Sequence, residues 1–295
     1  VPFFYLFGLS EVLFGSIIKG ATVVIIPRFT PRVVLEAIEK ERGSILFGVP
    51  AIHNALAMLR EEVIKGYDLS SLRVASTAGA KTSPRLMKML EDKFGLTLCE
   101  TYGLSELSVV SMSTIDDHKL GTVGKPICDL KIVDDKGEEV TTGEIGEALF
   151  KAPWMMKEYY KAPELTAQVI KDGWFHTGDS VRMDEDGYVK YVEKKSFIIV
   201  TPAGLKISPW EVENVLLRHP GIAEAAYVGI GDACRGLVPT AFIVLKEGQS
   251  VTTEEIANFC RQNLADFKLP KRFEFVDGIP KTGSGKINRQ QLKRP

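Results

Sequence analysis

The sequence predicts a parallel α/β segment, a β-rich segment and a small α+β domain at the C-terminal side of the chain. Three observations lead to this fold class. Helix and strand patterns alternate over residues 8–101, short turn-rich runs fill residues 118–193, and a mixed pattern begins near residue 198. Alternating strands and helices are typical of a parallel sheet covered by helices. Short runs between turn residues are typical of antiparallel strands.

These changes of pattern predict where the domains meet. We expect a large domain at residues 1–193, a hinge at residues 194–199 and a small domain at residues 200–295. Within the large domain, residues 1–117 are the α/β part and residues 118–193 are the β-rich part. A run of charged residues marks the start of the hinge.

The elements of the α/β part follow from apolar runs and helix start signals. The predicted strands span residues 22–27, 45–48, 72–77 and 96–100. The predicted helices span residues 31–43, 50–62 and 84–95. Thr30 and Ser83 each precede a proline, a pair that commonly opens a helix, and Gly43 and Gly95 are stop signals. Ligands on such sheets lie where the strands end, so residues after the run at 96–100 are candidates for a site.

The C-terminal part carries two further helix signals. Ser208 with Glu211, and Thr252 with Glu255, have the spacing of capping boxes before apolar helical patterns. Strands are predicted at residues 225–230, 240–245 and 273–276. Together these elements make a compact α+β domain.

The composition of the 295 residues excludes several classes of protein. A net charge of −1 gives no electrostatic case for binding nucleic acid or an anionic membrane. The four cysteines are far apart and include no CxxC pair, which argues against structural zinc and a disulfide framework and favours a reduced, cytoplasmic setting. No apolar run is long enough to span a membrane.

One nucleotide site is described by three short stretches, at residues 100–106, 173–179 and 280–286. The first offers the Tyr102 ring, a hydroxyl and the Glu106 carboxylate, a hard ligand suited to Mg²⁺. The second ends in Asp179, a carboxylate suited to a sugar diol. The third places Lys286 on a glycine-rich loop. Together they indicate a site that activates a carboxylic acid with ATP.

Each stretch also has a simpler interpretation. Asp179 follows a glycine, a pair common in β-turns, and Lys286 belongs to a basic tail in solvent. Tyr102 fills the core, and Glu106 is a solvated carboxylate. The small residues at 76–80 either let a flat ring approach the backbone or pack tightly against a helix.

The lysine loop is not a P-loop. The Walker A pattern needs glycine where Pro280 stands, and serine or threonine where Ile287 stands. We interpret the segment as a flexible loop that delivers the Lys286 ammonium to a phosphate or carboxylate.

In this order and spacing, the stretches resemble the adenylate-forming superfamily of acyl-CoA synthetases, aryl-CoA ligases, firefly luciferase and non-ribosomal adenylation domains. The resemblance covers essentially the whole chain. Further matching motifs lie at residues 67–73, 78–80, 121–126, 143–147 and 207–213. The last, Ile-Ser-Pro-Trp-Glu-Val-Glu, looks like the form found in CoA ligases, whereas carrier-loading adenylation domains usually have Leu-Gly-Glu there.

The resemblance implies roles at the matching positions. In the large domain the nucleotide would be held by Ala78, Gly79, Ala80, Thr101, Tyr102, Gly103 and Ser105, with Ser105 at a phosphate. Glu106 would bind Mg²⁺ and act in catalysis. Asp179 and Lys194 would hold the ribose, Lys286 would assist adenylation, and Gly204 would lie near the path of the CoA thiol.

The activity that the resemblance implies is an AMP-forming carboxylate–CoA ligase that uses ATP, Mg²⁺ and coenzyme A. The carboxylate attacks the α-phosphate to give acyl-AMP, the C-terminal domain rotates, and the CoA thiol then attacks the acyl-AMP. Two alternatives remain. One is a degenerate relative that binds AMP or acyl-AMP without turnover, and the other is an adenylating enzyme whose acceptor is a carrier-protein thiol.

The sequence departs from the family pattern at several positions. Tyr5 stands where the family has a histidine, Lys194 stands where it has an arginine, and Ser196 and Phe197 alter the hinge motif. The family's glycine-rich triphosphate loop would lie upstream of Val1. We therefore expect the sequence to lack the N-terminal part of the large domain and to be impaired as an enzyme by itself.

Overall fold

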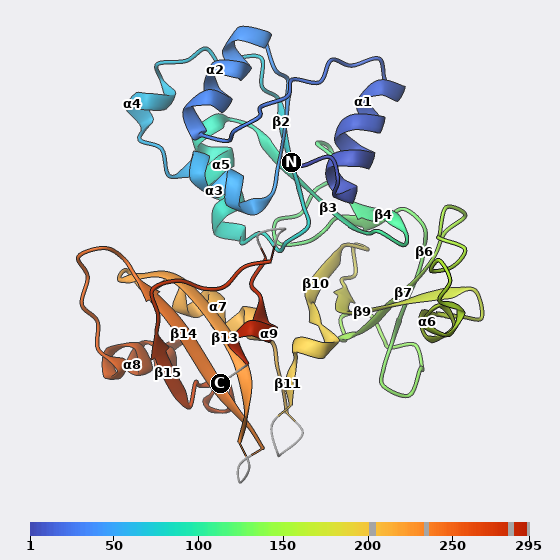
Figure 1. Cartoon of the computed structure of the whole chain (residues 1–295), viewed down its shortest axis with the longest axis vertical. Helices are drawn as coiled ribbons and strands as arrows, with labels where there is room; N and C mark the ends of the chain where they lie inside the picture. Colours follow the sequence, from blue (N-terminus) through green and yellow to red (C-terminus); the bar gives the residue numbers. More distant parts are fainter. Residues whose placement is uncertain (201–204, 233–235, 283–285, 294–295) are drawn as a thin grey trace. The chain divides into compact units, whose positions relative to one another are not determined.

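The chain forms two compact units in the computed structural model, which describes residues 1–200, 205–232, 236–282 and 286–293 (Figure 1). The N-terminal unit comprises residues 1–177 and 181–191. The C-terminal unit comprises residues 178–180 and 192–295. The architecture is α/β followed by α+β, as the sequence predicts.

A five-stranded sheet organises the first part of the N-terminal unit. Its strands lie in the order β1 (Ile45–Gly48), β2 (Val74–Ala78), β3 (Thr97–Leu104), β4 (Ser108–Met112) and β5 (Lys125–Pro126). The first three are parallel, as predicted, and the last two join antiparallel. The sheet is therefore mixed, because the chain turns back directly after β3 instead of crossing over through a helix.

Helices cover both faces of this sheet (Figure 1). On one side lie α2 (Pro31–Glu41), α3 (Pro50–Ala57), α4 (Glu61–Ile64) and α5 (Pro84–Phe94). Their apolar side chains share one core cluster with Leu98 of β3. On the other side lie the π-helix η1 (Phe7–Phe14) and α1 (Gly15–Ile18). Glu11 of η1 contacts Thr101, which lies three residues beyond Leu98 and so on the opposite face of the strand.

The helix start signals act as the sequence predicts. The Thr30 hydroxyl accepts a hydrogen bond from Val33 N at 3.2 Å, and the Ser83 hydroxyl accepts one from Leu86 N at 3.2 Å. α5 ends at Gly95, which has a φ of 63°. These side chains satisfy amide groups that the first helical turn leaves without an intrahelical partner.

The predicted helix at residues 50–62 is wrong, because two short helices, α3 and α4, take its place. The Lys93 ammonium of α5 donates hydrogen bonds to the carbonyls of Ala57 and Leu59 at 2.5 and 2.9 Å. Carbonyls that accept from a lysine are satisfied without a further helical turn. The tertiary contact therefore ends α3 where the apolar pattern alone would continue it.

Two strand predictions also need correction. Residues 22–27 form no strand in the described structure; Val24 and Ile25 are 45% and 66% exposed, while Ile26 packs on the core. An apolar run cannot supply the neighbouring strand that a ladder needs. The strand predicted at 96–100 instead continues to Leu104, so Thr101, Tyr102 and Gly103 belong to β3 itself.

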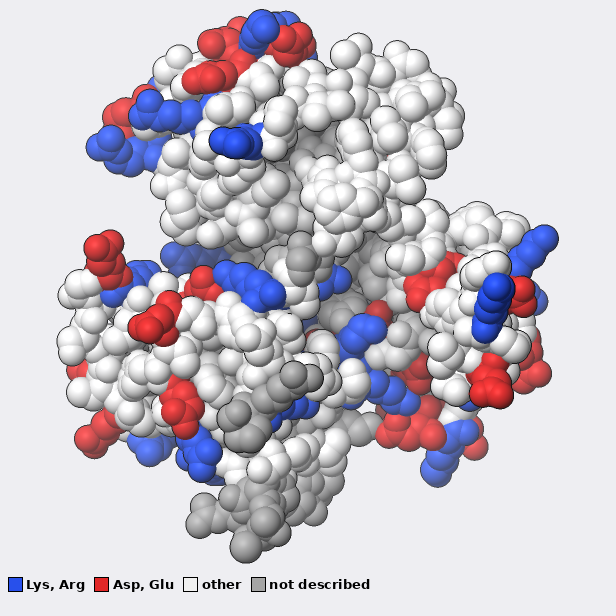
Figure 2. All heavy atoms as spheres, in the orientation of Figure 1, with Lys and Arg blue, Asp and Glu red and all other residues white. Residues whose placement is uncertain are grey.

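The surface around α1 is apolar. Figure 2 shows charged side chains gathered over α2 and α4 and almost none around α1. Phe14, Ile17 and Ile18 are 51%, 62% and 79% exposed there. Among the described residues, no helix has both the length and the apolar character needed to cross a membrane.

The β-rich part is a second sheet. Its strands lie in the order β10 (Val189–Lys194), β9 (Trp174–Met183), β7 (Gly146–Lys151) and β6 (Asp129–Val133), with β8 (Ile170–Lys171) beside β9. β6 and β7 are antiparallel, as predicted. The helix α6 (Pro163–Val169) was not predicted. Phe150, Val181 and Val189 are buried in the cluster that this sheet shares with Tyr102.

The C-terminal unit is a small α+β domain. Its three-stranded sheet has the order β13 (Ile222–Asp232), β14 (Gly236–Leu245) and β15 (Arg272–Phe275), the first pair antiparallel and the second parallel. The short strands β11 (Ile199–Val200) and β12 (Lys206–Ile207) pair antiparallel. Its helices are α7 (Pro209–Leu216), α8 (Thr253–Asn263) and α9 (Arg289–Leu292). Leu216 of α7 and Ile256 of α8 pack with Tyr227 of β13 and Ile243 of β14 in one buried core.

Of the two capping boxes predicted in this unit, one is correct. The Thr252 hydroxyl accepts from Glu255 N at 3.2 Å, and the Glu255 carboxylate accepts from Thr252 N at 2.7 Å. The box at Ser208 is wrong. The Ser208 hydroxyl is buried with no hydrogen bond, and Glu211 N donates to the Ser208 carbonyl at 3.1 Å instead. The Glu211 carboxylate pairs with Lys268 at 2.6 Å. The lysine competes successfully for the carboxylate that the box would use.

This contrast predicts different costs for two similar substitutions. Thr252→Ala should destabilise the C-terminal unit by about 1 kcal/mol, because α8 loses a capping hydrogen bond. Ser208→Ala is the matched control and should cost clearly less, because its hydroxyl caps nothing. Urea unfolding midpoints, together with hydrogen exchange of the α8 amides, measure both. Equal losses in the two variants would contradict the assignment.

Candidate functional site

The ends of β2 and β3 carry the first group of predicted site residues. Ala78 lies opposite Thr101 in the parallel register. Gly79 and Ala80 follow in an exposed bend, where Gly79 has a φ of +83° and no atom within 4 Å of the position a Cβ would take. Positive φ and open space leave the Gly79 backbone accessible to a flat ligand.

The side chains of Thr101 and Tyr102 have different surroundings. Thr101 is 6% exposed, and its hydroxyl donates to Glu11 Oε2 at 3.4 Å. Tyr102 is 9% exposed, with its ring centroid 5.9 Å from that of Phe150 and 5.8 Å from that of Tyr191. Tyr102 is therefore a core residue.

A tight turn follows β3 and carries Ser105 and Glu106. A Cβ on Gly103 would lie 2.5 Å from the Ser108 carbonyl oxygen, and Ser108 itself has a φ of 54°. Only glycine fits where the two backbones approach so closely. Ser105 is exposed in the turn, and Glu106 is half-buried.

Tyr159 holds Glu106 in place, a contact that sequence analysis did not identify. The Tyr159 hydroxyl donates to Glu106 Oε1 at 2.7 Å, and Met156 N donates to the Glu106 carbonyl at 2.8 Å. Burial, and then the Glu106 carboxylate, raise the pKa of Tyr159 to about 12. A carboxylate has about four acceptor sites, so Glu106 keeps oxygen lone pairs for a hard cation. The carboxylate oxygens of Glu106 are therefore suitable ligands for Mg²⁺.

Two carboxyls with perturbed pKa values, the buried Glu100 and the half-buried Glu11, lie beside this group. Glu100 is 3% exposed and accepts from Thr82 N at 3.3 Å. Burial raises the pKa of Glu100 to about 8, and it raises the pKa of Glu11 to about 7. Carboxyls with perturbed pKa values are enriched at functional sites.

Asp179 lies on a strand and not in a β-turn, so the simpler interpretation of its motif is wrong. Residues 177–179 belong to β9, with Gly178 at a φ of +66°. The Thr177 hydroxyl donates to the Ala148 carbonyl of β7 at 2.7 Å, which fixes the segment on the sheet. Asp179 is 3% exposed.

Lys286 lies on a closed loop and not on a free tail. Thr282 N donates to the Lys286 carbonyl at 2.7 Å, and Lys286 N donates to the Thr282 hydroxyl at 3.2 Å. Lys281 and Ile287 form an antiparallel β-bridge. The structure therefore closes the base of the predicted loop. Gly204, the predicted neighbour of the thiol path, lies outside the described residues.

The C-terminal unit brings Asp179, Lys194 and Lys286 within electrostatic range of one another. Residue 286 is exposed overall, yet partial desolvation of its ammonium lowers the pKa of Lys286. The Asp179 carboxylate opposes this shift and the Lys194 ammonium adds to it. One anion and two cations, from three distant parts of the sequence, thus form a charge group suited to a phosphorylated ligand.

Sequence analysis missed Arg289. Its Nη2 donates to Glu213 Oε2 at 3.0 Å, its Nη1 lies 2.8 Å from Glu213 Oε1 but out of line for a hydrogen bond, and its Nη2 lies 3.7 Å from Glu193 Oε2. All three residues are under 9% exposed. A signal existed, because Glu213 follows the buried Val212 on α7 and needs a counter-charge.

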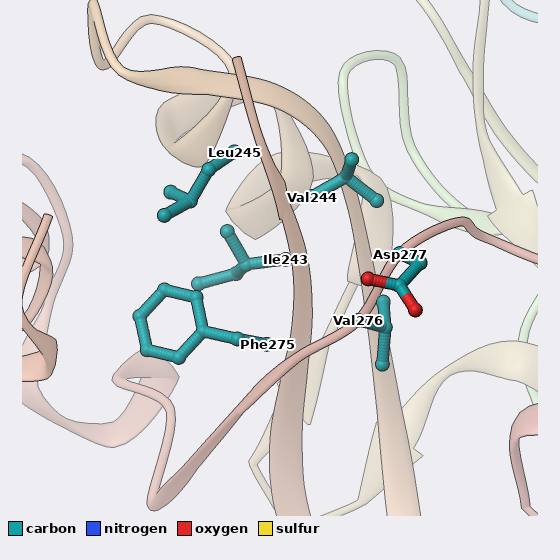
Figure 3. Close-up of a pocket in the computed structure, with 6 residues that line it drawn as sticks. All are labelled: Ile243, Val244, Leu245, Phe275, Val276 and Asp277. Atoms are coloured by element: carbon teal, nitrogen blue, oxygen red, sulfur yellow. The ribbon is translucent and has the colours of Figure 1, made fainter. Parts of the chain in front are cut away.

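A hollow on the C-terminal unit is a poorer candidate. It has a volume of about 330 Å³ and is lined by Ile243, Val244, Leu245, Phe275, Val276 and Asp277. Figure 3 shows Ile243, Leu245 and Phe275 to one side of the strands and Asp277 to the other. Binding sites need several convergent polar groups, and this lining has one charged side chain.

The chain is similar to known proteins over nearly its whole length. The family model "AMP-binding enzyme" matches residues 1–160, and "AMP-binding enzyme C-terminal domain" matches residues 211–286. The chain is similar to a long-chain-fatty-acid–CoA ligase of Bacillus subtilis, at 37% identity over 99% of this chain and 52% of that protein. It is also similar to a feruloyl-CoA synthase of Amycolatopsis, at 36% identity over 99% of this chain and 60% of that protein.

A solved structure of a CoA synthetase is also similar to this chain. The O-succinylbenzoate coenzyme A synthetase of Bacillus subtilis, in complex with ATP and magnesium, superposes with a TM-score of 0.88 and 32% identity. The match covers 100% of this chain and 60% of that one. The chain spans about half the length of the curated relatives it matches.

The raised pKa of Glu100 predicts how stability varies with pH. The unfolded chain releases this proton near pH 4.5 and the folded chain holds it to about pH 8. Between these values the folded state binds more protons, so stability falls as pH rises. Glu11 acts in the same direction. Glu100→Gln keeps the shape without titrating, so its urea midpoint should fall less from about pH 5 to pH 8 than the wild-type midpoint.

The control for this experiment is Glu62→Gln, which changes an exposed carboxylate on α4. It should follow the wild-type dependence on pH. Parallel curves for the wild type and Glu100→Gln would show that Glu100 is ionised in the folded state.

Proposed function

The chain belongs to the AMP-binding enzyme family, and we propose that it acts as a carboxylate–CoA ligase of the acyl- or aryl-CoA synthetase type. In this reaction ATP activates a carboxylic acid as acyl-AMP, and the acyl group then passes to the thiol of coenzyme A. The observation that carries the proposal is the family match, which covers residues 1–160 and 211–286 and includes Glu106 and Lys286. The electrostatic influence of Asp179 and Lys194 on Lys286 supports it. The CoA ligase names of the relatives support the thiol acceptor.

The nucleotide is assigned to residues of both units. In the N-terminal unit we propose Ala78, Gly79, Ala80, Thr101, Tyr102, Gly103 and Ser105. The exposed Gly79 backbone supports the adenine part of this assignment, and the exposed Ser105 hydroxyl supports a phosphate contact. In the C-terminal unit Asp179 accepts hydrogen bonds from the ribose hydroxyls, and Lys194 supplies a positive charge.

Glu106 is the proposed Mg²⁺ ligand. The Tyr159 hydroxyl donates to Glu106 Oε1 and so orients the carboxylate. The remaining lone pairs of the carboxylate are left for the metal ion. Bound Mg²⁺ would supply positive charge at the phosphates of ATP. An anchored carboxylate costs less entropy to order on binding than a free one.

Lys286 serves the first half of the reaction. A carboxylate oxygen of the acid bonds to the α-phosphorus of ATP, and the bond from that phosphorus to the bridging oxygen breaks to release pyrophosphate. Two anions approach in this step, so a nearby ammonium lowers their repulsion. Desolvation lowers the pKa of Lys286, so its ammonium is less strongly hydrated than that of a free lysine.

The second half transfers the acyl group. The CoA sulfur bonds to the acyl carbon, the bond from that carbon to the AMP oxygen breaks, and the thiol proton is released to solvent. This step joins a thiol to a carbonyl instead of joining two anions, so it depends less on Lys286. We include Gly204 at the thiol path on the basis of its position in the motif alone.

A cytoplasmic location belongs to the same proposal. It is supported by the free thiols of Cys99, Cys128 and Cys260, two of which are buried. Reduced cysteines are typical of the cytosol.

An adenylation assay on the full-length protein tests the function. Exchange of radioactive pyrophosphate into ATP, dependent on a carboxylic acid, should appear without CoA, and AMP release should rise when CoA is added. Exchange without any response to CoA would favour a carrier-protein acceptor. AMP binding without exchange would favour a binding protein.

We expect Asp179→Ala in the full-length protein to weaken AMP binding by roughly 1.5–3 kcal/mol, the range for hydrogen bonds to a charged group. Asp129→Ala, an exposed carboxylate on β6, is the matched control and should leave the affinity unchanged. Titration calorimetry gives both values. An unchanged affinity in Asp179→Ala would remove this residue from the ribose site.

Lys286→Ala should slow acyl-AMP formation by at least about 10²-fold, the scale for losing one electrostatic donor. Conversion of supplied acyl-AMP with CoA should be largely intact. Each half-reaction is measured separately on the full-length protein, and Lys271→Ala, an exposed lysine of the same unit, is the control. Equal loss in both half-reactions would mean that Lys286 is structural.

A further inference from the structure

We propose that Arg289 is a positioning residue for Lys286: through buried contacts with Glu213 and Glu193, it fixes the base of the lysine loop next to Lys194 and Asp179. The proposal rests on the proposed function for its catalytic meaning. The positioning itself depends only on the structure of the C-terminal unit.

Arg289 is anchored by several elements of that unit. Its guanidinium contacts Glu213 of α7 and Glu193 near the end of β10. It also lies 5.4 Å from the Phe197 ring centroid, a cation–π distance. Tyr227 N of β13 donates to Glu213 Oε1 at 2.8 Å, so the carboxylate that receives Arg289 is itself fixed by the central strand.

A short ladder connects this anchor to the lysine. Asn288 N, next to Arg289, donates to the Pro280 carbonyl at 2.8 Å. Thr282 N donates to the Lys286 carbonyl at 2.7 Å. The two bonds pair the entering and leaving strands of the loop, so a displacement of Arg289 moves the residue that carries the ammonium.

The other end of the anchor reaches the second cation of the charge group. Glu193 precedes Lys194 in β10, and its Oε1 accepts from Lys194 N at 3.0 Å. Arg289 therefore joins Lys286 and Lys194 through one buried bridge. Two ammonium groups held in range of each other repel, and a rigid connection is needed to keep them there.

The chemistry of the bridge requires arginine. Glu213 accepts a hydrogen bond from Nη2 at 3.0 Å and forms an ion pair with Nη1 at 2.8 Å, and Glu193 lies 3.7 Å from Nη2. Burial raises the pKa of Glu213, the Arg289 charge opposes that shift, and Glu193 adds to it. Lysine offers one nitrogen and cannot reach both carboxylates as a planar fork does.

The first experiment measures the position of Lys286 without using activity. Lysines of the full-length protein are methylated with ¹³C-formaldehyde and cyanoborohydride, which keeps their charge, and titrated by NMR; Lys286→Arg identifies the signal. Arg289→Lys preserves the net charge. If it releases the loop, the ammonium regains water and the pKa of Lys286 rises toward the ordinary lysine range. Arg272→Lys, an exposed arginine on β15, is the control and should cause no shift.

Glu193→Gln is a second variant in case Arg289→Lys does not fold. It leaves the Arg289–Glu213 pair intact and removes one anion. Removing an anion by charge alone would lower the pKa of Lys286, whereas release of the loop would raise it. A rise therefore supports positioning, and a fall contradicts it.

The second experiment measures the half-reactions. Arg289→Lys should slow acyl-AMP formation by about 10- to 10²-fold, the effect of displacing a reacting group by roughly 1 Å. The rate of acyl transfer from supplied acyl-AMP to CoA should change less. An unchanged pKa of Lys286 in both variants would overturn the positioning role. A shifted pKa with normal adenylation in Lys286→Ala would instead overturn the proposed function of Lys286 and leave the positioning intact.

Discussion

The parallel pairing of β2 with β3 is the constraint on which the N-terminal unit depends. It sets Ala78 opposite Thr101 and leaves both strand ends at one edge of the sheet. Because side chains alternate across a strand, Leu98 must face the helical core when Thr101 faces η1. A slip of one residue would exchange these faces and bury the wrong set. The register of one strand pair therefore decides which residues a ligand can meet.

In the C-terminal unit, the buried charge of Arg289 constrains the structure, as the register of β2 and β3 does in the N-terminal unit. Burying the Arg289 guanidinium costs free energy, and the carboxylates of Glu213 and Glu193 offset this cost. Removing one partner of the pair would leave an uncompensated buried charge. Such a pair contributes less to net stability than apolar packing would. It does specify one arrangement, because only one placement of α9 satisfies Glu213 and Glu193 together. A site that must hold like charges in range benefits from that specificity.

The sequence predicted what local signals encode. Thr30, Ser83 and Thr252 cap helices as their spacing indicates, and the fold class and family are correct. The failures share a cause in distant contacts. Lys93 ends α3 early, Lys268 draws Glu211 from its box, and Tyr159 reaches Glu106 from 53 residues away. The candidate site residues were proposed from motifs, whereas Arg289 required a structure because neither of its partners is near it in sequence.

Gly103 has a consequence for which sequences can encode this turn. Every missense change of a single base in a glycine codon adds a Cβ, and at this position that atom would lie 2.5 Å from the Ser108 carbonyl oxygen. Gly79 differs, because a Cβ there meets no atom and only the positive φ opposes it. A single substitution at Gly79, at the end of β2, therefore meets no steric clash. A single substitution at Gly103 would disrupt the turn that carries Ser105 and Glu106. A lineage could change Gly103 only after Ser108 had moved.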